Sequence, residues 1–207
     1  MHLAQCAEVL GAANKKGRHA LAIGLVRQCV ESLSIIEAGM LPPAEGAVLL
    51  QKWLDDKLSL GALRAELEKT AWGRYGPGLW SEPWSEFFGQ FAKAVQPYAH
   101  YTPLLMGWQF AAPPDSSPKD GQMLIALGPE TYDPLKASRV TLLQCLLFWA
   151  LARILVANKL PAAISDVELA RMGKSLAESE LLSGGHATWS QEFLPHHWFT
   201  DGKRRFS

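Results

Sequence analysis

Arg27 and Glu31 are a charged pair, four residues apart, inside an otherwise apolar segment from His19 to Met40. If this segment is helical, the two side chains lie one turn apart on a narrow stripe that also holds Gly24 and Ser34. An arginine placed in this way can hold an anion, and the carboxylate beside it can orient that anion or act as a base. The pair can instead be a salt bridge on the solvent-facing edge of the helix. The sequence leaves both interpretations open.

A second group of residues with possible acid–base chemistry lies between Pro97 and Pro103, where a helix is expected to end or kink. It contains Tyr98, His100 and Tyr101. Because histidine exchanges a proton near neutral pH, His100 is a candidate acid or base. Together with the charged pair of the earlier helix, the three residues would form a ligand-binding site. The alternative is a structural histidine that caps the helix end.

The segment Arg27-Gln28-Cys29-Val30-Glu31-Ser32, followed later by Tyr98-Ala99-His100-Tyr101-Thr102-Pro103, resembles HEPN-like families of uncharacterised prokaryotic proteins. In these families an early long helix carries an Arg-x-x-x-Glu-like core, and a later helix ends in a Ser/Tyr-x-His-Pro/Thr segment. The resemblance covers residues 18–102. It implies an up-and-down helical bundle, often dimeric, in proteins linked to RNA cleavage, RNA binding or phage defence.

Active HEPN ribonucleases carry an arginine that is followed, after four to six residues, by a histidine on the same helix. No arginine of this chain has a histidine at that distance. We therefore favour a non-catalytic, HEPN-like binding or assembly module, accessory to a prokaryotic defence or toxin–antitoxin system. The alternative function is a metal-independent RNase or phosphate-transfer enzyme, in which Arg27, Glu31 and His100 converge from separate helices.

Apolar residues recur at helical spacing through nearly the whole chain, which predicts an all-α fold, an up-and-down helical bundle of six to eight helices. The segments 18–40 and 133–158 are apolar on most of their circumference, so we expect them at the centre. The interruption of the second segment by Gln144 and Arg153 favours a buried core helix over a membrane span. The predicted core includes Leu25, Cys29, Leu33, Phe87, Phe91, Leu146 and Trp149.

Polar residues with a preference for helix N-termini mark where several helices begin. Ser59 is expected to cap a helix over 60–72, and Ser81 is expected to cap the aromatic helix that follows the Gly76–Gly78 loop. Asp133 precedes the long apolar helix. Ser165 and Glu168 form a capping-box pattern for a helix that should end near Gly184.

Residues 1–185 are predicted to form a single helical domain, and residues 186–207 an irregular aromatic and basic tail that packs on the domain or on a partner. Met123–Leu127 could form a short strand. The tail contains His186, His196 and His197, but no HxxxH or HExxH spacing occurs. We therefore expect no metal site.

Twenty basic and twenty acidic side chains leave the chain without net charge, which argues against non-specific nucleic-acid binding. Three widely spaced cysteines indicate neither a disulfide framework nor a thiolate zinc site. Phosphate-binding glycine motifs are absent, so no cofactor is expected. These features predict a cytoplasmic protein that forms a homodimer and binds an RNA or protein partner, with no membrane association.

Overall fold

The computed structural model describes residues 2–98, 105, 108–109, 132–162, 164–179 and 182. Within these residues the chain forms seven α-helices and two short 3₁₀ turns, and no β-strand. The predicted all-α fold is therefore confirmed. The helices are α1 (His2–Lys15), α2 (His19–Gly39), α3 (Pro43–Leu54), α4 (Leu60–Thr70), α5 (Trp84–Val95), α7 (Pro134–Ala157) and α8 (Asp166–Ala177), and the 3₁₀ turns are η1 (Trp72–Arg74) and η2 (Gln96–Tyr98).

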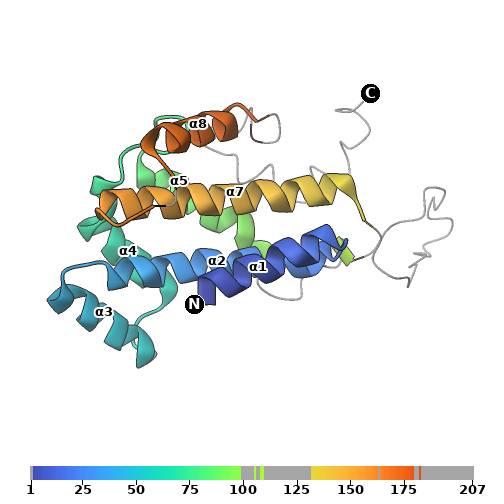
Figure 1. The fold of residues 1–207 in the computed structure, drawn as a ribbon. Helices are drawn as coiled ribbons and strands as arrows, with labels where there is room; N and C mark the ends of the chain where they lie inside the picture. Colours follow the sequence, from blue (N-terminus) through green and yellow to red (C-terminus); the bar gives the residue numbers. More distant parts are fainter. Residues whose placement is uncertain are drawn as a thin grey trace.

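Helix α2 lies at the centre of this arrangement. It contacts α1, α3, α4, α5 and α7, as the pattern of its apolar residues predicts. Figure 1 shows α1 and α7 running alongside α2, with α8 on the far side of α7. Twelve of the 21 residues of α2 are therefore buried, and His19, Ser34 and Glu37 are among them.

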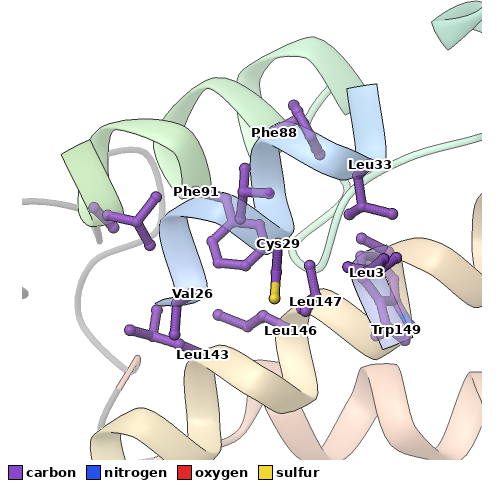
Figure 2. Close-up of a cluster of buried hydrophobic side chains, with 14 of the residues drawn as sticks. Leu3, Val26, Cys29, Leu33, Phe88, Phe91, Leu143, Leu146, Leu147 and Trp149 are labelled. Atoms are coloured by element: carbon purple, nitrogen blue, oxygen red, sulfur yellow. The ribbon is translucent and has the colours of Figure 1, made fainter. Parts of the chain in front are cut away.

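The core is built where α2, α5 and α7 meet. Figure 2 shows Val26 and Cys29 of α2 between the side chains of the other two helices. Of the predicted core residues, Leu25 is only partly buried, since it lies toward the outer side of α2. The six others are all buried: Cys29, Leu33, Phe87, Phe91, Leu146 and Trp149.

Three of the predicted helix caps are present. The Ser59 hydroxyl accepts a hydrogen bond from the backbone N–H of Ala62 (3.2 Å), Asp133 caps α7, and Ser165 forms a capping box with Glu168. The prediction for Ser81 is wrong, because α5 begins at Trp84 behind Pro83, with no side-chain cap. Helix α8 ends at Ala177, earlier than predicted.

A buried hydrogen-bond network joins α1, α2 and α7. His19 lies 2.8 Å from Asn14 through its Nδ1, and its Nε2 accepts from the backbone N–H of Asp133 (3.0 Å). Asn14 in turn donates to the carbonyl of Ala137 and to the hydroxyl of Thr141. Burial lowers the pKa of His19, and the neutral ring suits these contacts because Nε2 must accept.

Arg153 shows how α7 accommodates a cation in its apolar segment. Its guanidinium donates to the backbone carbonyls of Tyr75 and Pro77. The same group lies 5.1 Å from the ring centre of Trp149 and 5.9 Å from that of Trp84. Cation–π contacts and carbonyl acceptors compensate for its partial burial, which lowers its pKa. The side chain thereby fastens the loop after η1 to α7.

By length and composition alone, helices α2 and α7 are both long and apolar enough to cross a membrane. Half of the 18-residue apolar stretch of each helix is buried inside the protein. The core helix of a soluble protein meets the same criterion, so this observation is weak evidence for a span. The predicted strand at Met123–Leu127 and the tail over 186–207 lie outside the described residues.

We expect truncation of Phe91, which is fully buried, to lower the free energy of unfolding by about 3–5 kcal/mol, because it removes a ring from the centre of the core. Urea denaturation of Phe91→Ala measures this change. Phe148→Ala is the control, since Phe148 is 41% exposed and its loss should cost clearly less than the loss of Phe91. Equal, small effects of the two substitutions would contradict the assignment of the core.

Candidate functional site

Arg27 and Glu31 form the ion pair that their spacing predicts. Nε of Arg27 lies 2.5 Å from Oε1 of Glu31, and the two side chains are 25% and 33% exposed. Both side chains are thus less than half exposed, and each has a polar partner. The partner is the other member of the pair, on the same helix.

A second arginine, Arg64 of α4, joins this stripe of α2. Its Nε donates to the Ser34 hydroxyl (3.1 Å), and its guanidinium lies 5.5 Å from the ring centre of Phe88. Burial lowers the pKa of Arg64, and the charges of Glu31 and Arg27 act on it in opposite directions. Arg27, Glu31, Ser34 and Arg64 therefore make one electrostatically coupled group, the α2–α4 charged cluster.

The hydrogen bonding of the α2–α4 charged cluster leaves donors for a ligand. Within the described residues, the hydrogen bonds of Arg27 and Arg64 run through Nε, so that the terminal Nη nitrogens are not used. Such nitrogens form the bidentate donor pairs that carboxylates and phosphates accept. The cluster thus offers two guanidinium groups to an anionic ligand, next to the carboxylate of Glu31, and the charge of the buried Glu37 also acts on Arg64.

Glu37 lies two turns beyond Glu31 on α2 and is completely buried. Its Oε1 accepts from the indole N–H of Trp72 (3.1 Å). Burial raises the pKa of Glu37 to about 7, and the neighbouring Tyr75 and Trp72 side chains and the charge of Arg64 offset part of this effect. A carboxyl group in this environment exchanges its proton near neutral pH.

The structure places Tyr98 in the core rather than on the charged stripe. Its side chain is 3% exposed and its ring lies 5.7 Å from that of Trp108. Burial raises the pKa of Tyr98 to about 12, although its hydrogen bond with Trp108 and the charge of Arg139 act in the opposite direction. His100 and Tyr101 lie outside the described residues, so their convergence with Arg27 and Glu31 stays a prediction.

Sequence reasoning missed three charged residues of the interior. Glu37 has a signal: it lies near the C-terminus of α2, where the helix dipole disfavours a carboxylate. Nothing in the sequence marks Arg64 as an interior residue, because α4 has the pattern of an ordinary amphipathic helix. The sequence around Arg139 of α7 likewise gives no sign that this side chain is buried. Burial lowers the pKa of Arg139 to about 9, while the charges of Tyr98 and Asp133 raise it.

In the part of the chain that the structure describes, no group of three or more histidine, cysteine, aspartate or glutamate side chains could hold a metal ion. Cys29 is buried, and burial raises the pKa of its thiol to about 12, so the thiolate is not formed at neutral pH. Neither a family model nor a curated protein nor a solved structure matches this chain.

The buried carboxyl of Glu37 should give the stability of the protein a distinctive pH dependence. Because its pKa rises from 4.5 to about 7 on folding, the folded protein binds more protons than the unfolded chain between these values. The contribution of Glu37 to the free energy of unfolding therefore falls by about 3 kcal/mol as the pH rises through this window.

The substitution Glu37→Gln should remove that loss, since the amide stays neutral and can still accept from Trp72. The difference in the free energy of unfolding between Glu37→Gln and the wild type should therefore be about 3 kcal/mol more favourable to the variant at pH 8 than at pH 4. Urea denaturation at the two pH values measures it. Glu86→Gln, at an exposed position of α5, is the matched control and should leave the pH dependence unchanged. Parallel pH profiles for wild type and Glu37→Gln would mean that Glu37 ionises normally.

Proposed function

We propose that this chain is a non-catalytic helical binding and assembly module of the HEPN-like kind, accessory to a prokaryotic defence or toxin–antitoxin system. The observation that carries the proposal is the α2–α4 charged cluster, in which Arg27 and Arg64 each keep terminal nitrogens for a ligand. A partly exposed ion pair of this kind stabilises a protein little, so stability alone does not account for it.

The proposal favours an acidic segment of a protein partner over RNA. An RNA-binding surface needs many cations along a backbone, whereas the α2–α4 charged cluster offers two arginines beside a carboxylate, and the whole chain has no net charge. Two guanidinium groups at a fixed spacing suit one or two carboxylates of a peptide. We also place the protein in the cytoplasm, because all three of its cysteines are free rather than joined in disulfides.

The test uses fluorescence anisotropy with two labelled probes, a 12-residue peptide rich in glutamate and a 12-nucleotide single-stranded RNA. We expect the wild type to bind the peptide more tightly than the RNA, and Arg27→Ala/Arg64→Ala to weaken peptide binding by at least about tenfold. Arg171→Ala, an exposed arginine of α8, controls for the loss of charge. In thermal melts Arg27→Ala alone should cost less than about 1 kcal/mol.

Three results would contradict the proposal. The first is an absence of peptide binding, and the second is peptide binding that Arg171→Ala weakens as much as the double variant does. The third is cleavage of the RNA by the wild type that Arg27→Ala abolishes. That last outcome would instead support phosphate-transfer chemistry by Arg27, Glu31 and His100.

A further inference from the structure

Helix α3 has the composition of a core helix but is covered on one side only. Most of its residues are apolar, yet Gly46 alone is buried in this helix, all of which the structure describes. Val48 is 52% exposed and Leu54 is 68% exposed. Figure 1 shows α3 at the margin of the bundle, beyond the end of α2. An apolar helix left this open in a single chain calls for a covering surface.

One side of α3 is occupied by the chain itself. Gly46 lies so close to α2 that a Cβ atom there would be 2.5 Å from the carbonyl oxygen of Ala38. Leu49 and Leu50, partly buried, pack against the core from the same side. The opposite side, which we call the outer face of α3, is exposed and consists of Ala44, Ala47, Val48, Gln51 and Leu54.

The charges beside the outer face indicate what covers it. Glu45 and Lys52 are both exposed and lie seven residues apart, two turns along the same edge of the helix. When two copies of a helix pack antiparallel around a twofold axis, residues on one edge meet residues on the same edge of the partner. Glu45 would then lie beside the partner subunit's Lys52, and Lys52 beside the partner subunit's Glu45. Val48 would lie next to the axis.

We propose that the outer face of α3 is a homodimer interface in which two α3 helices pack antiparallel, with Val48 near the twofold axis and two Glu45–Lys52 pairs across it. A contact of about three helical turns is at the small end of specific interfaces, so the dimer dissociates on dilution. The α2–α4 charged cluster lies on other helices. This interface can therefore exist or fail independently of the function proposed above.

Sedimentation equilibrium of the full chain, over a wide range of concentrations and at low salt, tests the apolar part of the interface. The wild type should form dimers reversibly, and Val48→Glu should shift the dissociation constant by at least about tenfold toward monomer. Val9→Glu on α1 is the matched control, because Val9 is 50% exposed and lies away from α3. A wild type that stays monomeric, or a dimer that Val9→Glu weakens as much as Val48→Glu, would overturn the proposal.

Charge reversal tests the antiparallel arrangement. Glu45→Lys and Lys52→Glu should each weaken the dimer by about tenfold, because like charges then face each other. The double variant Glu45→Lys/Lys52→Glu should restore it, and an equimolar mixture of the two single variants should form heterodimers. Circular dichroism confirms that each variant is folded. If the double variant is as monomeric as the single ones, two α3 helices do not pair in this way.

Discussion

The packing of α2 against five other helices is the constraint on which the rest of the structure depends. Since α1, α3, α4, α5 and α7 all contact this helix, its exposed side is reduced to an edge that includes Leu21 and Gln28. Every polar side chain on it must then reach an edge between neighbours or find a partner in the interior. The arrangement of Arg27, Ser34 and Glu37 follows from this requirement.

The interactions of the polar residues of α2 differ according to how deeply each side chain is buried. Near the surface Arg27 and Glu31 pair with each other. One turn further Ser34 accepts from Arg64, an arginine whose guanidinium is also stacked on an aromatic ring. Glu37, which like Ser34 is completely buried, has no contact with water, and burial raises its pKa to about 7. The recognition that we propose would therefore use the end of α2 that holds Arg27 and Glu31, whereas Glu37 belongs to the core.

The sequence was a good guide where the physics is local or periodic. The spacing of apolar residues predicted α2 and α7, and the side chains of Ser59, Asp133 and Ser165 marked three helix starts. It failed at Ser81, which has a positive φ of 69° and belongs to the turn before α5, while Pro83, which has no side-chain acceptor, takes the N-cap position. It also failed for Arg64, whose approach to Ser34 depends on how α4 crosses α2. The contact between Arg64 and Ser34 arises from tertiary packing, so no short sequence pattern predicts it.

Native-state hydrogen exchange at low protein concentration tests the central position of α2 most directly. The account predicts that backbone amides in the middle of α2 and α7 exchange only through global unfolding, with the full free energy of unfolding as their protection. The amides of α3, which has Gly46 as its one buried residue, should exchange through local opening, at least about a hundred times faster. Amides of α2 that exchange as fast as those of α3 would contradict the account.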